Sequence, residues 1–226
     1  MSLTILDDLE QGTEAWHDAR RGIVTASVVG KLLTPTGKVA NNDTARAVTA
    51  TLVAERITGW TEDTPMTADM WRGCDAEPFA RDIYSAHYQQ AVEVGFMRLD
   101  EDWGTLGYSP DGLVGTDGLI EIKAPRSKGH LSTILSGEVP SYYLAQCQAG
   151  LLVSGRDWLD FVSYVAGMPL FVKRVLPDPK WHDAIREAVR EFERAAWEMT
   201  ARYEQAVTNL PATERINFDT VELKLA

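Results

Sequence analysis

Several features that define whole classes of protein are scarce or missing in this 226-residue chain. No apolar run approaches the roughly 20 residues that a membrane-spanning helix needs. The beginning MSLTILDDLE is acidic and lacks the basic and apolar regions of a signal peptide. With only two cysteines, Cys74 and Cys147, one chain cannot build a four-cysteine zinc or iron–sulfur site. We therefore expect a protein of the reducing cytoplasm, without a membrane partner.

Common nucleotide-binding and hydrolase motifs are absent as well. The pair Gly37-Lys38 lacks the upstream glycine of a Walker A loop. The sequence contains no H-E-x-x-H, no G-x-S-x-G and no G-x-G-x-x-G. These absences argue against a P-loop NTPase, a zincin protease, an α/β-hydrolase and a dinucleotide-binding enzyme.

Positive charge is in deficit, with 22 Lys and Arg against 33 Asp and Glu and a net charge of −11. On charge alone this favours a soluble acidic protein over a nucleic-acid binder, whose surface is usually basic. The bases are nevertheless concentrated, because residues 20–50 carry five bases and one acid, and residues 123–137 carry three bases and no acid. An acidic exterior with a locally basic cleft would reconcile the two patterns, since electrostatic potential is set locally.

The chain shows no linker or repeat, so we predict a single domain over residues 1–226. A helical part is expected over about 1–90, a strand-rich core over about 91–176, and a C-terminal helix over about 179–206. The order of helices, strand cluster, helix, two strands and helix predicts an α/β fold with a central mixed β-sheet flanked by helices.

Local patterns predict where several elements begin and end. Thr25 is a typical N-cap for a helix that runs through Leu33. Pro78 lies inside the helical stretch 67–89, which it should kink or restart. Alternating apolar residues over 92–96 are typical of one half-buried strand.

The residues best suited to chemistry are a Ser-Pro-Asp-Gly turn at 109–112 and a strand that contains Glu121 and Lys123. Residues two apart in a strand share a face, so Glu121 and Lys123 should project together while the alternate isoleucines pack behind them. If Asp111 meets Glu121, the two carboxylates form a hard oxygen site suited to Mg²⁺ or Mn²⁺. A neighbouring lysine can stabilise charge on a reacting phosphate. Taken separately, the turn and the strand face are ordinary structural features.

Four blocks in order carry a resemblance to a known family. They are QGTEAWHDARRGIVTAS (11–27), WRGCDAEPFAR (71–81), YSPDGLVG…GLIEIKAP (108–125) and YYLAQCQ (142–148). Over about residues 11–175 the chain resembles the phage lambda-type exonucleases, which belong to the YqaJ-like viral recombinase family of the PD-(D/E)XK nuclease superfamily. The resemblance implies a core like that of restriction endonucleases.

The resemblance also implies an activity and partners. Members are Mg²⁺-dependent 5′→3′ exonucleases, with Mn²⁺ as a substitute, that digest one strand of duplex DNA from 5′-phosphorylated ends. They leave 3′ overhangs for recombination by a single-strand annealing protein, and they assemble as ring-shaped homotrimers. The chain would then be a phage or prophage protein that acts in the cytoplasm of a bacterial cell.

The same resemblance assigns roles at the metal site. It makes Asp111, Glu121 and the backbone carbonyl of Ile122 the metal ligands, and Lys123 the catalytic lysine. Beside them it places a catalytic glutamate, a catalytic glutamine and a substrate-facing tyrosine: Glu77, Gln146 and Tyr143.

A second group of residues matches the pocket that holds the terminal 5′-phosphate in this family. These are Arg20, Ser27 and Ser109, with Thr25 facing the substrate. A helix start with hydroxyls and a nearby arginine is a suitable place for a phosphate.

Two other functions remain open from the sequence. The fold could serve an endonuclease or a nuclease of CRISPR adaptation, although the cysteine cluster of the latter is missing. It could also be a non-catalytic module that binds DNA ends, against which the paired acids Asp111 and Glu121 argue. Activity on a closed circular plasmid separates an endonuclease from an exonuclease, and a metal titration tests for catalysis.

Overall fold

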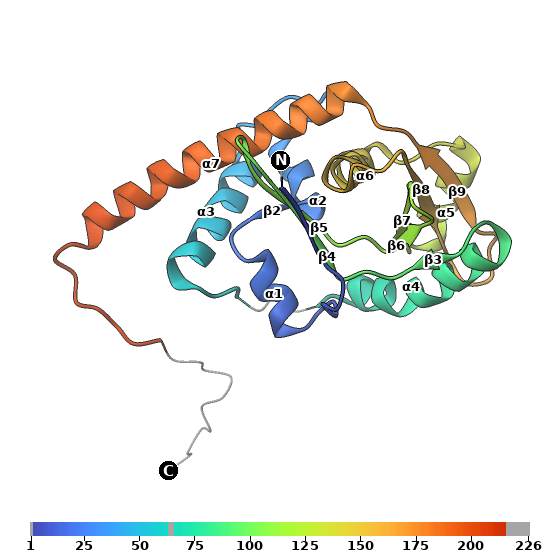
Figure 1. Cartoon of the computed structure of the whole chain (residues 1–226), viewed down its shortest axis with the longest axis horizontal. Coiled ribbons are helices and arrows are strands. Elements are labelled where there is room, and N and C mark those ends of the chain that lie inside the picture. Colours follow the sequence, from blue (N-terminus) through green and yellow to red (C-terminus); the bar gives the residue numbers. More distant parts are fainter. Residues whose placement is uncertain (1, 63–65, 216–226) are drawn as a thin grey trace, which may run out of the picture.

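A computed structural model describes residues 2–62 and 66–215 of the chain (Figure 1). Its described strands form two sheets, each mixed in direction. The first has the order β1-β4-β5-β2, with β1 (Ser2–Leu6), β2 (Val24–Thr25), β4 (Phe96–Glu101) and β5 (Gly104–Tyr108). The second has the order β3-β6-β7-β8-β9, with β3 (Ala91–Val92), β6 (Gly112–Val114), β7 (Gly118–Lys123), β8 (Trp158–Ser163) and β9 (Phe171–Val175).

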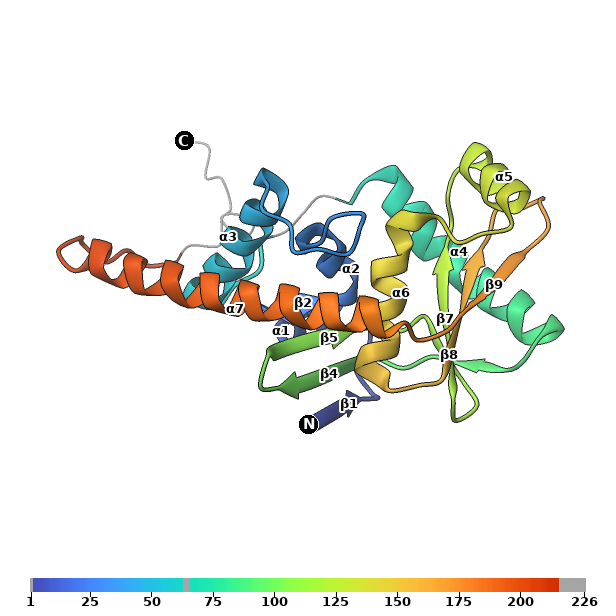
Figure 2. The same cartoon turned by 90° about the horizontal axis from the view of Figure 1, so that it is seen from above.

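Helices flank both sheets, and α6 contacts strands of each (Figure 2). The long helix α7 runs along one side of the molecule and extends beyond its body (Figures 1 and 2). The helical elements are α1 (Glu14–Arg20), α2 (Ala26–Val29), η1 (Gly30–Leu32), α3 (Asp43–Thr58), α4 (Ala68–His87), α5 (Ser127–Ser136), α6 (Ser141–Ser154) and α7 (Pro179–Val207). The predicted α/β class, with mixed β-structure flanked by helices, is confirmed, but the described strands form two mixed sheets where one central sheet was expected.

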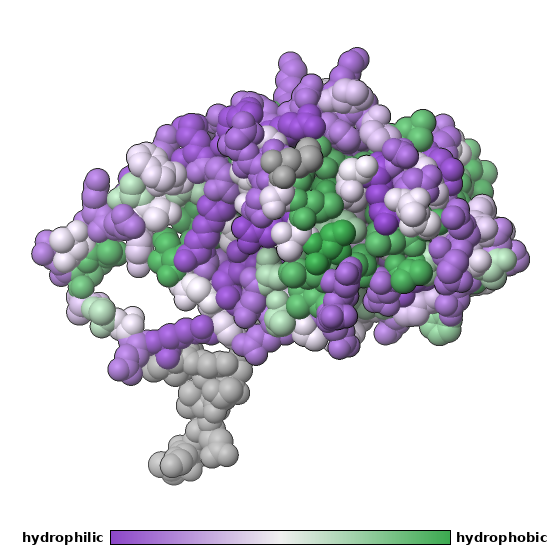
Figure 3. Space-filling model, in the orientation of Figure 1, coloured by the Kyte–Doolittle hydropathy of each residue, from purple (hydrophilic) through white to green (hydrophobic). Residues whose placement is uncertain are grey.

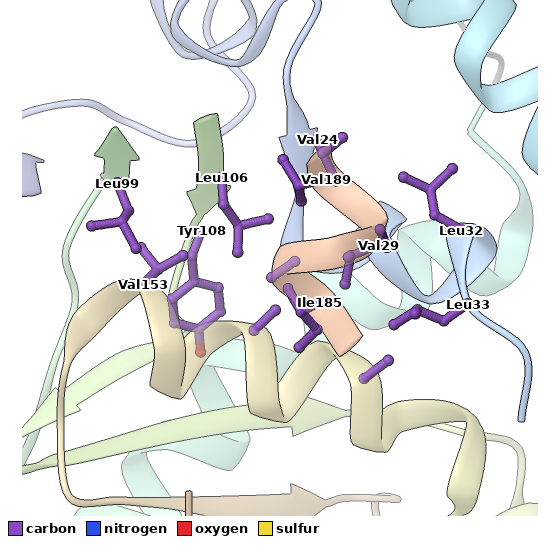
Figure 4. Close-up of a cluster of buried hydrophobic side chains, with 14 of the residues drawn as sticks. Val24, Val29, Leu32, Leu33, Leu99, Leu106, Tyr108, Val153, Ile185 and Val189 are labelled. Atoms are coloured by element: carbon purple, nitrogen blue, oxygen red, sulfur yellow. The ribbon is translucent and has the colours of Figure 1, made fainter. Parts of the chain in front are cut away.

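One buried apolar cluster joins the two sheets through the helices between them (Figure 4). Leu106 of β5 and Leu159 of β8 both belong to it, as do Ile185 and Val189 of α7. Each fully buried aliphatic side chain of this kind stabilises the fold by roughly 1.5–3 kcal/mol. The first half of α7 is therefore a structural part of the core, and it holds the first sheet against α6.

The segment predicted as one strand over 92–96 is divided between the two sheets. Ala91–Val92 pairs with β6, whereas Phe96 begins β4 beside β1 and β5. Between them, a β-carbon at Gly95 would lie 2.2 Å from the carbonyl oxygen of Leu9. Only glycine permits this close approach of two backbone segments, so the alternation there marks a crossing between sheets and not one strand.

Two helix predictions are also corrected. Of the two outcomes expected at Pro78, a restart does not occur: α4 is one helix from Ala68 to His87, and Tyr84 ties it to Asp160 further on, at 2.7 Å. The helix expected from Thr25 is a single α-helical turn followed by a 3₁₀ turn. Its β-branched Val28 and Val29 and its glycine favour a helix poorly.

The surface is mostly hydrophilic on the face shown in Figure 3, with the largest hydrophobic area to the right of centre. None of the helices in residues 2–62 and 66–215 combines the length and the apolarity that crossing a bilayer requires. Several large apolar side chains of α4 are exposed, namely Met70, Trp71, Phe79 and Ile83.

Candidate active site

A cleft of about 660 Å³ brings the predicted site residues together. They come from the segment around α1 and α2, from α4, from the turn between β5 and β6, from β7 and from α6. Every site residue that the sequence predicted lines this cleft: Arg20, Thr25, Ser27, Glu77, Ser109, Asp111, Glu121, Ile122, Lys123, Tyr143 and Gln146. The residues lie close in space although they are up to 126 positions apart in the chain, from Arg20 to Gln146.

Strand β7 supplies the centre of the cleft. It is an interior strand, antiparallel to β6 and parallel to β8. Glu121 and Lys123 project into the cleft, while Ile120 and Ile122 pack in a second apolar cluster with Tyr84 of α4. The division of β7 into a polar and an apolar face, predicted from the spacing, is confirmed.

The carboxylate of Glu121 is held by three donors and is only 1% exposed. Its Oε1 accepts hydrogen bonds from Nζ of Lys123 at 2.7 Å and from Nε2 of Gln146 at 2.5 Å. Its Oε2 accepts one from the hydroxyl of Tyr108 at 3.0 Å. Tyr108 was not predicted as a site residue, although it is the last residue of β5 and stands immediately before the Ser-Pro-Asp-Gly turn. These bonds fix the orientation of the buried carboxylate.

Asp111 lies beside β7, directly before β6. Its Oδ2 accepts a hydrogen bond from the backbone N–H of Ile122 at 2.5 Å. Burial raises the pKa of Asp111 well above its ordinary value, and the negative charges of Glu121 and Glu77 raise it further. The two predicted metal-binding acids are therefore close enough to repel each other.

The backbone carbonyl of Ile122 points to the same side of β7 as Asp111. The carbonyl of Lys123 accepts from Tyr164 N–H on the β8 side at 2.9 Å. Successive carbonyls of a strand alternate in direction, so that of Ile122 points away from β8. Two carboxylates and a carbonyl therefore face one region.

These donors fit a hard divalent cation. Among the described residues, no three His, Cys, Asp or Glu side chains are grouped as a metal cage. The available set is the smaller one of Asp111, Glu121 and the Ile122 carbonyl. Mg²⁺ commonly binds through one or two carboxylates and keeps several waters, and Mn²⁺ accepts similar oxygen donors. A cation would also relieve the repulsion that raises the pKa of Asp111.

Lys123 is positively charged in this setting. Burial lowers its pKa, but the carboxylates of Glu121 and Asp111 outweigh burial and leave the pKa raised above the ordinary value. Its Nζ lies 5.6 Å from the centre of the Tyr143 ring, within range of a cation–π interaction. Tyr143 in turn lies against Phe161 of β8, with ring centroids 5.5 Å apart. The lysine is thus presented as a cation at the edge of the cleft.

A second polar cluster lies next to the carboxylates. Nη1 of Arg20 donates to Oγ of Ser109 at 3.2 Å, and Nε1 of Trp16 donates to the same oxygen at 2.9 Å. The Arg20 guanidinium also lies 3.8 Å from the centre of the Trp16 ring. The bond between Trp16 and Ser109 was not foreseen from the sequence, because it joins residues 93 positions apart.

The hydroxyls of Thr25 and Ser27 lie 3.1 Å apart on the same wall of the cleft. Thr25 is the N-cap residue of α2, as predicted, but its hydroxyl is bonded to Ser27 and makes no capping bond to the helix. Burial lowers the pKa of Arg20 to about 10, opposed by attraction to Glu55. The arginine is therefore a cation that the fold keeps partly away from water.

The lining of the cleft is balanced in charge and is not the locally basic lining that would reconcile an acidic protein with DNA binding. Four bases and four acids line it, and Asp69 is paired with both Arg72 and Arg126. A bound divalent cation would make the cleft positive and better suited to a phosphate backbone.

A mixed sheet that presents an aspartate in a turn, and a glutamate and lysine two apart on a strand, defines the PD-(D/E)XK nuclease class. The chain belongs to the family of the YqaJ-like viral recombinase domain, whose family model matches residues 15–157. A search of curated proteins finds no significant match.

Solved structures agree with this family. An alkaline exonuclease from Laribacter hongkongensis has a TM-score of 0.78 and 33% identity over 88% of this chain and 100% of its own. Its complex with dAMP gives 0.77 and 34% over the same shares. A phage-related exonuclease from Haemophilus somnus 129PT, with a TM-score of 0.58 and 14% identity over 80% of this chain and 96% of its own, shares the fold. The family and these structures support a DNA exonuclease.

Proposed function

We propose that this protein is a Mg²⁺-dependent 5′→3′ exonuclease that digests one strand of duplex DNA from 5′-phosphorylated ends and leaves 3′ overhangs. The observation that carries the proposal is the position of Ser109. It accepts hydrogen bonds from Arg20 and Trp16 and stands two residues before the carboxylate of Asp111. An anion-binding cluster and a metal-binding cluster are therefore joined by one short turn.

The cluster around Ser109 is suited to a terminal phosphate. A serine hydroxyl has two acceptor lone pairs and one hydrogen to donate. Arg20 and Trp16 both donate to Ser109, so the hydroxyl hydrogen remains for an outside acceptor. A terminal phosphate monoester carries close to two negative charges, against one for an internal diester. Binding of that end would set the polarity of digestion.

The second cluster would hold the scissile phosphate. A bound Mg²⁺ would polarise the phosphate and lower the pKa of the attacking water. Asp111, Glu121 and the Ile122 carbonyl would hold the ion, and Gln146 keeps Glu121 oriented. Lys123, positively charged, would donate to the phosphate oxygen on which charge develops. Glu77 of α4 also lines the cleft, where its carboxylate would orient water.

Attack of water on phosphorus with loss of the 3′ oxygen would release a 5′-mononucleotide. The proton of the water passes to solvent, and the departing 3′ oxygen gains one. The phosphate stays on the next nucleotide, so each cut creates a new 5′-phosphorylated end for the cluster around Ser109. The dAMP complex of the similar alkaline exonuclease supports a mononucleotide product.

We also propose the assembly and the setting that the family resemblance implies. The protein would form a homotrimeric ring, cooperate with a single-strand annealing protein, and act in the cytoplasm of a bacterial cell that carries the phage or prophage. A ring would retain an acidic protein on DNA by topology, where bulk charge gives little affinity. Light scattering should give three times the 25.1 kDa of one chain; a monomer at micromolar concentration would contradict the ring.

A linear duplex labelled at either end tests the activity. With Mg²⁺, a 5′ label should appear early as a mononucleotide, whereas a 3′ label should stay on long fragments. A closed circular plasmid should remain intact. Nicking of the plasmid would indicate an endonuclease, and DNA-end binding without metal-dependent cleavage would indicate a non-catalytic module.

A further inference from the structure

Arg81 of α4 is the cation that ties the helix carboxylate Glu77 to the turn containing Asp111. We propose that Arg81 is a positioning residue, which fixes Asp111 and Glu77 relative to each other so that a metal ion can bind between the two sides of the cleft. This inference rests on the proposed function and adds a residue to it.

The guanidinium of Arg81 contacts three separate segments. Its Nε donates to the backbone carbonyl of Asp111 at 2.7 Å, in the turn before β6. Its Nη2 donates to Oε1 of Glu77 at 2.5 Å, one turn earlier on α4, and its Nη1 donates to Glu93, between β3 and β4, at 3.0 Å. The planar fork of an arginine can serve three acceptors in fixed directions, which a lysine cannot do.

The contact with Asp111 restrains a backbone group from which the predicted ligand projects. Arg81 binds the Asp111 carbonyl, while the N–H of Ile122 binds its side chain. The following Gly112 packs closely, since a β-carbon there would lie 3.0 Å from the Ile120 side chain. Asp111 is thus held at its carbonyl, at its carboxylate and at the next residue, and removal of Arg81 would release the first of these.

Arg81 acts through its neighbours and not on the substrate. Its side chain is 12% exposed and does not line the cleft, whereas Glu77 and Asp111 do. Groups that orient metal ligands in this way typically change metal affinity or activity by roughly 10–100-fold when removed.

If Arg81 only attached α4 to the sheet, its replacement would have different effects. The helix has an independent attachment three residues later, where the Tyr84 hydroxyl donates to the buried Asp160 at 2.7 Å. Ala80, next to Arg81, is also fully buried. The helix should therefore stay in place without Arg81, and Tyr84→Phe provides a matched control that weakens only the attachment.

The test compares Arg81→Met and Arg81→Lys with Tyr84→Phe and Glu93→Gln, which removes the exposed ion pair alone. Mn²⁺ binding to the full-length protein is measured by titration with electron paramagnetic resonance. Cleavage of a 5′-phosphorylated linear duplex is measured against Mg²⁺ concentration, with kcat and KM for DNA determined separately. Thermal unfolding reports folding, and Asp111→Asn serves as the reference for a lost ligand.

For Arg81→Met we expect the Mn²⁺ concentration at half-saturation to rise at least tenfold and kcat to fall roughly 10–100-fold, with KM for DNA within twofold. Arg81→Lys should show the same loss of Mn²⁺ affinity and of kcat as Arg81→Met. Tyr84→Phe should lower Tm and leave metal binding unchanged. Wild-type Mn²⁺ binding by Arg81→Met, or full recovery in Arg81→Lys, would overturn the positioning role alone. If wild type and Asp111→Asn bind Mn²⁺ equally and neither cleaves, the proposed function itself fails, and the role of Arg81 with it.

Discussion

Nζ of Lys123 lies 2.7 Å from Oε1 of Glu121, and both side chains project from the same face of β7. The same oxygen accepts a bond from Gln146 at 2.5 Å. Because the carboxylate is buried, its attraction raises the pKa of the lysine although burial alone would lower it. The pair therefore couples a predicted metal ligand to a fixed positive charge.

Replacing that charge should affect turnover more than binding. Lys123→Ala should retain metal and DNA binding but lose turnover by orders of magnitude, because the developing charge on phosphate loses its partner. Lys123→Arg should fail too, since a planar fork is not a compact ammonium. Single-turnover cleavage and DNA affinity by fluorescence anisotropy check this, with exposed Lys128→Ala as control. An equal loss of binding and catalysis would argue against a transition-state role.

Neutralising Asp111 should stabilise the metal-free protein at neutral pH. Its pKa in the fold is raised above the ordinary 3.8, so the ionised carboxylate destabilises the fold increasingly as pH rises through the folded-state value. In EDTA, Asp111→Asn should therefore unfold at a higher temperature than wild type at pH 7, and the difference should disappear near pH 3. Mg²⁺ should raise the Tm of wild type only. Identical melting curves for the two proteins across this pH range would show that ionised Asp111 does not destabilise the metal-free fold.

Arg20 should determine the preference for a 5′-phosphate. A hydrogen bond to a charged group contributes about 1.5–3 kcal/mol, equivalent to roughly ten- to hundredfold in rate. Wild type should digest 5′-phosphorylated duplex at least tenfold faster than 5′-hydroxyl duplex, and Arg20→Ala should lose most of that preference. Arg21→Ala, whose partner is the exposed Asp18, is the control. Equal wild-type rates, or an undiminished preference in Arg20→Ala, would leave Arg20 as a residue that only closes its helix.

Two glycines with nearly equal φ angles allow the free-energy cost of a strained backbone to be distinguished from the cost of side-chain crowding. Gly22 has φ 67° and Gly59 has φ 65°, but a β-carbon at Gly22 would lie 2.5 Å from Cγ of Arg56, while Gly59 has open space. Arg56 cannot move freely, because it donates to the Gly22 carbonyl at 2.6 Å and pairs with Glu193 of α7 at 2.7 Å.

Gly59→Ala should cost about 1–2 kcal/mol for its left-handed backbone. Gly22→Ala should cost at least about 1 kcal/mol more, because of overpacking against Arg56. Urea unfolding measures both, and equal destabilisation would show that Arg56 gives way. As Gly22 lies two residues after Arg20, Gly22→Ala should also reduce the 5′-phosphate preference.

The candidate site was predicted most directly where it depends on spacing. The two-residue interval between Glu121 and Lys123 places both on one face of any strand, and β7 confirms it. The places of Glu77 and Gln146 were taken from family resemblance, since no local rule brings two helices to the same strand. Arg81 was overlooked within a block that had been recognised, because its role depends on a carbonyl 30 positions away.

The fold was predicted unevenly for the same reason. The C-terminal helix expected over about residues 179–206 is present as α7, Pro179–Val207, because helical periodicity is a local pattern. Helix α5 and strand β1 were not foreseen, because the buried side chains of the first are the polar His130 and Thr133 and the second is exposed along its whole length. Neither element buries an apolar face, which is the feature from which a sequence pattern indicates a helix or a strand.

By itself, the sequence determined which residues could do chemistry and how they face within each element, because side-chain direction repeats every 2.0 residues in strands and every 3.6 in helices. Only the tertiary structure decided that the period-two run over 92–96 serves two sheets and that Arg20 meets Ser109. Those outcomes depend on which distant surfaces pack together, here on α6 lying between the sheets. The packing of distant segments is determined by the burial of apolar surface in the whole core. A local sequence pattern carries no information about that burial.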